Sequence, residues 1–217
     1  DEVQRGKHDL VMIAAEAPAS RRDVFLGSTP MHLLRKCPCP VWAFRPRPGR
    51  GLEYCCNRIL ATVDALAPAP MEHDLNVKIL ELATSLARQE QADLSVIHCW
   101  SAHESLLPFS RDDVPTDGLD QYDRDVRREH RTRFKELLTP FREAGHEIRS
   151  HMVKGDPGLV IPRFAKRRKA DLVVMGTVTR TGIAGLLMGN TAEKALHHLD
   201  CSLLAVKPEG FLSPVTS

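Results

Sequence analysis

The sequence predicts an α/β protein built on an open, doubly wound sheet of five parallel strands. Two observations carry this prediction. Short, nearly continuous apolar runs alternate with segments of helical periodicity from about residue 59 onward, and strands covered on both faces have this composition. In addition, a segment near the N-terminus recurs near the C-terminus. Such self-similarity indicates tandem copies of one fold.

The expected elements alternate strictly along the chain. The strands are expected at 59–64, 93–100, 146–153, 171–175 and 201–206. Helices are expected at 74–89, 120–144 and 158–169, and a last helix begins at Asn190. Asn190 would cap that helix, and Glu193 would reach back to complete a capping box. The order β-α-β-α-β-α-β-α-β with right-handed crossovers gives the doubly wound sheet.

The repeat places residues 9–46 on residues 171–208 without a gap. Asp9, Gly27, Cys39 and Pro46 match Asp171, Gly189, Cys201 and Pro208 in this alignment. A duplicated domain of this kind implies three parts: an incomplete first copy over 1–46, a linker rich in Pro, Gly and Arg over 47–54, and a complete second copy over 55–210. Because the chain begins without Met and shortly before an apolar run, we expect that further chain precedes residue 1.

Composition narrows the class of protein. A net charge of +2 is too small to make nucleic acid an expected partner, and we expect none. No apolar run reaches 18 residues, so no membrane span is expected. The polar N-terminal segment lacks the features of a signal peptide, and the expected location is therefore the cytoplasm.

Six cysteines follow no disulfide or zinc spacing: Cys37, Cys39, Cys55, Cys56, Cys99 and Cys201. We expect small, reduced, mostly buried thiols and no metal. No catalytic arrangement is recognisable, because the sequence has no nucleophile elbow, no HExxH and no Walker loop. The sequence therefore argues against an enzyme, with a slow ATPase as a remote alternative.

One edge of the sheet gathers the candidate ligand contacts. Asp64 ends the first strand, and the loop 176–190 follows the fourth. In doubly wound sheets, ligands bind beyond the carboxyl ends of the strands where the strand order reverses. Asp64 would then contact a ligand or simply cap the turn after its strand, and Gly176 and Gly189 would serve a phosphate or only tight turns.

The segment Ala170–Glu193 (ADLVVMGTVTRTGIAGLLMGNTAE) and the ending CSLLAVKP resemble the hallmarks of the universal stress protein family. The opening ILATVD and the turn VKGDP fit the same family, and the tandem arrangement resembles its two-domain bacterial branch. The resemblance covers 55–208 and, in the partial copy, 5–46. It implies an adenine-nucleotide α-hydrolase-like, Rossmann-like fold and a loop whose backbone N–H groups wrap the phosphates of ATP.

When the family's nucleotide site is matched residue by residue, it falls on two segments of this sequence, the end of the first strand and the loop after the fourth. Asp64 matches the adenine-side aspartate, and Gly176 and Gly189 match two loop glycines. Thr179 stands where the family has a second glycine, and Asn190 replaces the usual Ser or Thr. The residues expected to contact an adenine nucleotide such as ATP are Thr62, Val63, Asp64, Met175, Gly176, Thr179, Gly189, Asn190 and Thr191. In the partial copy Ala14 and Ala17 replace both loop glycines, so we expect no triphosphate site there.

Two functions remain open from the sequence. One is a cytoplasmic stress-response protein with a degenerate ATP-type site, acting as a nucleotide- or ligand-dependent regulator. The alternative is a scaffold, or a protein that binds another small and perhaps lipid-like ligand. The resemblance also implies that the tandem copies form an internal pseudo-dimer through their last strands, with room for a homodimer of chains. Strand 201–206 would then pair with the other copy.

Overall fold

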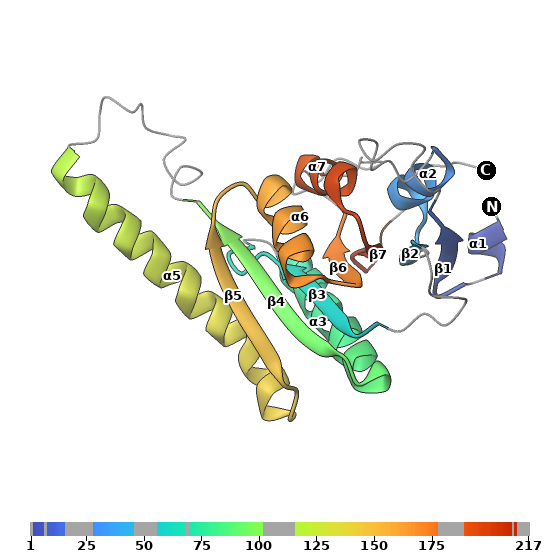
Figure 1. The fold of residues 1–217 in the computed structure, drawn as a ribbon, viewed down its shortest axis with the longest axis horizontal. Helices are drawn as coiled ribbons and strands as arrows, with labels where there is room; N and C mark the ends of the chain where they lie inside the picture. Colours follow the sequence, from blue (N-terminus) through green and yellow to red (C-terminus); the bar gives the residue numbers. More distant parts are fainter. Residues whose placement is uncertain are drawn as a thin grey trace.

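The computed structural model describes residues 2–6, 8–15, 28–45, 56–67, 70–101, 116–177, 189–209 and 211. Its strands are β1 (Val11–Ala14), β2 (Val41–Phe44), β3 (Arg58–Val63), β4 (Asp93–Trp100), β5 (Ile148–Lys154), β6 (Leu172–Gly176) and β7 (Ser202–Val206). Its helices are α1 (Glu2–Arg5), α2 (Ser28–Lys36), α3 (Pro70–Glu90), α5 (Thr116–Glu143), α6 (Pro157–Arg168) and α7 (Asn190–His198). Figure 1 shows their arrangement. The linker 47–54 lies outside the described residues.

The described strands form one seven-stranded sheet in the order β1-β2-β7-β6-β3-β4-β5. The five strands β7, β6, β3, β4 and β5 run parallel to one another. The doubly wound parallel sheet predicted from the sequence is therefore confirmed. Strand order reverses between β3 and β6, because the chain continues from β3 to β4 on one side and returns to β6 on the other.

The remaining two strands extend the sheet in the opposite direction. Strand β2 pairs antiparallel with β7, with Val41 opposite Ala205 and Ala43 opposite Leu203. Strand β1 then pairs parallel with β2. Strand β7 thus has a neighbour on each side, as expected for strand 201–206. The two segments related by the repeat meet where β2 pairs with β7, a boundary that we term the seam.

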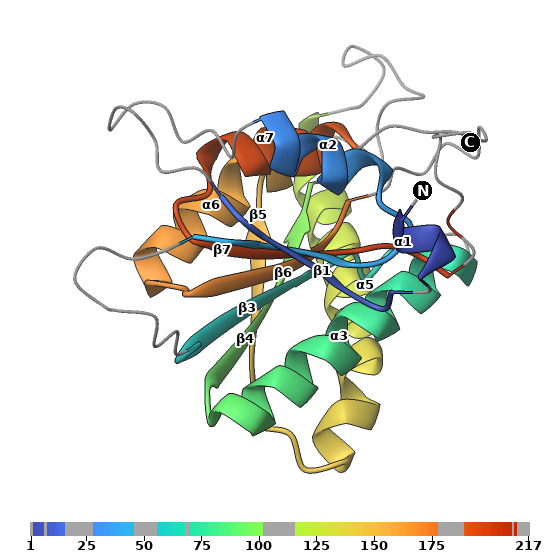
Figure 2. The same ribbon diagram turned by 90° about the vertical axis from the view of Figure 1, so that its right-hand side faces the viewer.

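Helices cover both faces of the sheet (Figure 2). On one face α2, α6 and α7 pack on a core that includes Leu34, Phe164 and Leu196. On the other face α3 and α5 enclose a second core that includes Leu80 and Leu138. This arrangement explains why the strand sequences are apolar at nearly every position. Across the described residues, every helix is too short or too polar to cross a lipid bilayer.

The start of α6 follows from its sequence. Asp156 is the N-cap, and its Oδ1 accepts a hydrogen bond of 2.9 Å from the backbone N–H of Gly158. Pro157 occupies the first turn, where its missing N–H costs nothing. Gly155 precedes the cap with φ of 137°, a conformation that favours glycine. The conformation of Gly155 and the cap on α6 therefore explain the sequence of the turn at 153–157, which resembles that of the family.

The expected start of α7 needs a correction. Gly189, not Asn190, is the N-cap, and it contributes no side-chain capping bond. The predicted capping box is therefore wrong. The carboxylate of Glu193 instead forms an ion pair with Arg35 of α2, on the other side of the seam. A charged partner from another helix competes successfully with a backbone N–H, since hydrogen bonds between ionised groups are the stronger kind.

Candidate functional site

A cleft of about 580 Å³ opens at the carboxyl ends of β3, β4 and β6. It lies at the point where strand order reverses, between α3 on one side of the sheet and the starts of α6 and α7 on the other. Of the residues predicted from the sequence, those that line it are Thr62, Val63, Asp64, Met175, Gly176, Gly189 and Thr191. Three segments distant in the chain therefore meet in one hollow, where a doubly wound sheet is expected to bind its ligand.

The backbone of Asp64 is held by Asn76 of α3. The Asp64 N–H donates to Asn76 Oδ1 at 3.0 Å, and Asn76 Nδ2 donates to the Asp64 oxygen at 2.7 Å. The side-chain Oδ1 of Asp64 accepts from the Leu66 N–H at 3.2 Å. Asp64 therefore caps the turn after β3 and also lines the cleft, and its contact with a ligand stays a prediction.

The two loop glycines have structural reasons of their own. A Cβ on Gly176 would lie 2.8 Å from Leu75 Cδ2 of α3, so this glycine allows the helix to approach the end of β6. The Gly189 N–H donates to the Thr177 oxygen at 3.1 Å, and this bond closes the loop that connects β6 to α7. Both glycines nevertheless line the cleft.

Two predicted residues are placed only in part or not at all. Thr179 lies outside the described residues, so its effect on phosphate binding stays a prediction. Asn190 is the first residue of α7, and its contact with phosphate likewise stays a prediction. Thr191 follows it, is exposed, and lines the cleft.

The cleft residues that were not expected from the sequence include three with polar side chains on helices: Glu72, Asn76 and His130. Asn76 is only 5% exposed. A polar residue in line with the apolar, core-facing positions of an amphipathic helix is a signal that could have found it. Glu72 Oε2 is buried and has no hydrogen-bond partner among the described residues. No sequence pattern connected Glu72 or His130 with Asp64, because the sheet alone brings their helices together.

The described lining is acidic. It includes Asp64 and Glu72, whereas no Lys or Arg lines the described part of the cleft. Cys99 also lines it, and burial, with smaller effects of Asp156 and Asp64, raises the pKa of its thiol to about 12. That thiol is therefore neutral and a poor nucleophile at physiological pH.

A second histidine near the cleft, His98 of β4, is completely buried. Both of its ring nitrogens have partners, the backbone next to Asp64 and the ring of His130. His98 is therefore a core histidine with its hydrogen-bonding capacity satisfied.

The cysteines behave as buried thiols. Cys37, Cys39, Cys56 and Cys201 are buried, and the sulfur atoms of Cys37 and Cys39 lie 3.5 Å apart. Burial is the main cause that raises the pKa of Cys39 to about 11. Among the described residues, no group of three His, Cys, Asp or Glu side chains is placed to hold a metal ion.

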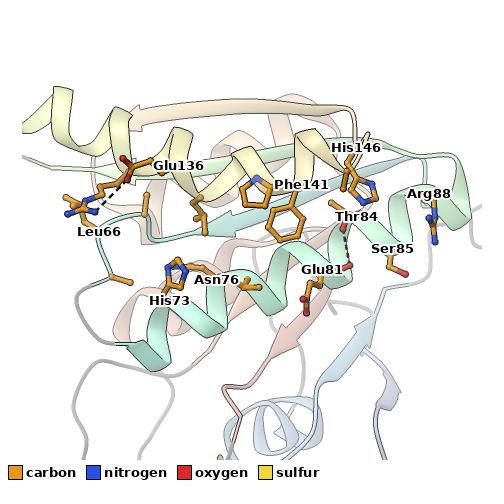
Figure 3. Close-up of a pocket in the computed structure, with 17 residues that line it drawn as sticks. Leu66, His73, Asn76, Glu81, Thr84, Ser85, Arg88, Glu136, Phe141 and His146 are labelled. Atoms are coloured by element: carbon orange, nitrogen blue, oxygen red, sulfur yellow. Dashed lines mark hydrogen bonds and ion pairs between the residues drawn. The ribbon is translucent and has the colours of Figure 1, made fainter.

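A second hollow, a groove of about 920 Å³, runs between α3 and α5. Figure 3 shows charged side chains such as Glu81, Arg88 and Glu136 along it, with Phe141 between the helices. The turn after Asp64 and the side chain of Asn76 separate this groove from the cleft and line both. Although the groove is larger, we place the site in the cleft, because the residues predicted from the sequence converge there.

Comparison with known proteins agrees with this geometry. The model of the universal stress protein family matches residues 57–207. Universal stress protein E of Escherichia coli strain K12 is 35% identical over 99% of this chain, and its homolog in Haemophilus influenzae is 32% identical over 96%. The chain spans 65% of the length of each. A crystal structure of a Pseudomonas aeruginosa PAO1 protein of unknown function matches with a TM-score of 0.74 and 26% identity, covering 97% of this chain and 66% of that one.

Proposed function

Because the chain belongs to the universal stress protein family, we propose that it is a cytoplasmic stress-response protein that binds an adenine nucleotide weakly in the cleft. The bound nucleotide changes the conformation of the protein or its choice of partners, so the protein acts as a regulator and not as a catalyst. The observation that carries the proposal is the convergence of Asp64, Gly176 and Gly189 at the reversal of strand order. Ligands of doubly wound sheets bind at that point.

The electrostatics support one orientation of the nucleotide. Asp64 and Glu72 are acceptors, so their end of the cleft suits the adenine amino group and ribose hydroxyls, which are donors. The same carboxylates repel phosphate. The N-terminus of α7, which begins after Gly189, carries the positive end of the helix dipole and suits the phosphates. The phosphates then lie away from the carboxylates.

The same features support weak binding. A triphosphate is usually held by Lys or Arg in addition to backbone N–H groups, and the described lining offers neither. Thr179 and Asn190 replace the family's glycine and hydroxyl residue at two further positions. We therefore expect a dissociation constant of about 0.1–1 mM, which corresponds to about 4–5.5 kcal/mol of binding free energy.

The test is titration calorimetry with Mg-ATP on the full-length protein. Asp64→Ala is expected to weaken binding by about tenfold or more, through the loss of a hydrogen bond to the base. Asp93→Ala is the matched control, because Asp93 is an exposed carboxylate at the opposite end of β4, paired with Arg149. Absence of binding at millimolar ATP would overturn the proposal. Turnover of ATP that Asp64→Ala abolishes would overturn its non-catalytic part.

We further propose that residues 1–46 end a first copy and residues 55–210 form a second, joined by 47–54 as an internal pseudo-dimer. The antiparallel pairing of β2 with β7 supports this arrangement, since equivalent last strands then face each other. The same symmetry leaves open a homodimer of whole chains, which sedimentation of the full-length protein would reveal by mass.

The groove between α3 and α5 favours a second candidate function. It combines an apolar floor, including Leu137 and Phe141, with charged residues at its rim. This composition suits an amphiphilic small molecule, such as a lipid-like ligand, in a family member that serves as a scaffold or carrier. Mass spectrometry of molecules released on denaturing the freshly purified protein separates the two. Released nucleotide supports the first function, whereas a released amphiphile supports the second.

A further inference from the structure

Two buried histidines form a direct hydrogen bond beside the cleft. His98 Nε2 lies 2.7 Å from His130 Nδ1, so one nitrogen donates and the other accepts. His98 is completely buried in β4, and His130 of α5 is only 7% exposed. Their rings stack with centroids 4.9 Å apart. Helix α5 lies along this side of the sheet (Figure 1), and His130 also lines the cleft.

The other ring nitrogen of His98 faces the backbone that carries Asp64. His98 Nδ1 lies 3.2 Å from the Val63 oxygen and 3.2 Å from the Ala65 nitrogen. A protonated Nδ1 donates to Val63, whereas an unprotonated Nδ1 accepts from the Ala65 N–H. The two bonds exclude each other, because a single nitrogen cannot donate and accept in the ring plane at once.

Which of the two histidines donates in their shared hydrogen bond therefore decides whether His98 Nδ1 bonds to Val63 or to Ala65. If His130 donates to His98, then His98 carries its proton on Nδ1 and holds Val63. If His98 donates to His130, then Nδ1 is free to accept from Ala65. A second proton on His98 places N–H groups at both ring positions, so the Ala65 N–H loses this acceptor. Val63 and Ala65 directly flank Asp64, so this choice acts on the turn that presents Asp64 to the cleft.

We propose that His98 and His130 are positioning residues that couple proton binding to the Asp64 turn and make ligand binding in the cleft pH-dependent. The ligand-binding part of this inference rests on the proposed function, whereas the coupling between the pair and the turn does not. The neutral pair in which His98 carries its proton on Nε2 accepts from the Ala65 N–H and keeps the turn in its binding geometry. A second proton on His98 releases the Ala65 N–H and weakens the site.

The surroundings favour neutral His98 at pH 7. Burial is the largest effect and lowers the pKa of His98, and His130 lowers it further, although Val63 and Asp64 act in the opposite direction. His98 therefore takes up a second proton only below the ordinary histidine pKa of about 6.5. Among the described residues, the charged groups near the pair include Asp64 after β3 and Glu72 on α3, which line the same cleft as His130. They also include Lys154 on β5, which lies over the Trp100 ring beside His130 and pairs with Asp123 on α5.

The first experiment measures ATP affinity of the full-length protein between pH 7.5 and 5.5. Wild-type affinity is expected to fall more than that of His98→Gln, by up to about tenfold over this range, which is the limit for one linked proton with a pKa at or below the ordinary histidine value. His98→Gln keeps polar atoms in place but does not titrate. His32→Gln, at an exposed histidine of α2, is the control and should follow the wild type. Protonation of ATP itself affects all three proteins equally. Equal pH profiles in wild type and His98→Gln would overturn the proposal.

The second experiment needs neither a variant nor a ligand. In ¹⁵N NMR spectra of the wild type recorded over a range of pH, the His98 and His130 ring signals and the Ala65 amide signal are expected to shift with one common midpoint. An Ala65 amide that does not follow the ring signals overturns the proposal, even if His98→Gln fails to fold. If ATP does not bind at any pH but the common midpoint is found, the proposed function fails while the coupling stands.

Discussion

Lys207 Nζ donates a hydrogen bond of 2.7 Å to the backbone oxygen of Leu34, across the seam between β7 and β2. The same ammonium donates to Thr177 Oγ1 at 2.7 Å and lies 4.8 Å from the centre of the Phe211 ring. Lys207 is 1% exposed. The ammonium group of Lys207 thus links Leu34 of α2 to Thr177, the first residue after β6. Burying this charge costs free energy, and that cost makes the stability of the protein depend on pH.

Lys207→Met should change the pH dependence of stability. Burial lowers the pKa of Lys207 to about 8, from about 10.5 in the unfolded chain. The unfolded state therefore binds more protons between these values, and the wild type gains stability as pH rises through that window. Relative to Lys207→Met, its free energy of unfolding should rise by about 2 kcal/mol between pH 7 and pH 9.5.

Chemical denaturation of both proteins at several pH values measures this difference, because other titrating groups contribute equally and cancel. Lys78→Met, at a half-buried lysine of α3 on the opposite face of the sheet, is measured in parallel as the control for exchanging a lysine for methionine. A constant difference between the wild type and Lys207→Met would contradict the lowered pKa.

Gly176→Ala should lower the affinity of the cleft for its ligand more than it lowers the stability of the fold. The added Cβ meets the tip of the Leu75 side chain at 2.8 Å, and a leucine tip can rotate away. We expect a loss of about 1 kcal/mol in stability, typical of mild overpacking. Leu75 also lines the cleft, so its displacement should lower ATP affinity by about tenfold, or about 1.4 kcal/mol.

The matched control is Gly145→Ala, whose φ of 85° makes alanine unfavourable although nothing lies near its Cβ. Its stability loss should be similar, about 1 kcal/mol, while ATP affinity stays unchanged. Equal affinities for the two variants, measured by calorimetry, would mean that Gly176 serves packing alone.

Asn76→Ala should damage both stability and binding. The change removes two hydrogen bonds to the Asp64 backbone and leaves partly buried polar groups without those partners. A loss of about 2–3 kcal/mol is expected in denaturant unfolding, and ATP affinity should fall at temperatures where the variant is fully folded. Thr139→Ala removes a side-chain bond to Lys135 within α5 and should leave affinity intact. Unaltered ATP binding by Asn76→Ala would show that Asp64 does not depend on this support.

The thiols of Cys39 and Cys99 should resist alkylation in the folded protein. Their pKa values are raised to about 11 and about 12 by burial, and only the thiolate reacts. At pH 8 both should react with iodoacetamide at least about 100-fold more slowly than in denaturant. Peptide mass spectrometry after timed pulses reports each cysteine separately, and a native rate within tenfold of the denatured rate would refute the prediction.

The positions of the strands and helices were predictable, because apolar runs and helical periodicity are local signals. β4 is found at 93–100, as predicted, and the other strands of the second copy lie within about two residues of their predicted positions. The start of α7 was predicted less well. Local sequence favoured a capping box, but Glu193 found Arg35, a partner 158 residues away in the chain. The long separation made this contact invisible in the sequence.

The sequence by itself determined the order of elements, the repeat, and the strand ends at which Asp64 and Gly176 stand, since each depends on residues close together in the chain or on direct similarity. Only the tertiary structure decided what surrounds these ends. Asn76 supports Asp64, His130 reaches His98, and Lys207 crosses to Leu34 because crossovers and sheet pairing bring distant segments together. Burial then sets the proton affinity of Lys207 and His98, because the loss of water raises the cost of charge, and no local pattern reports that loss.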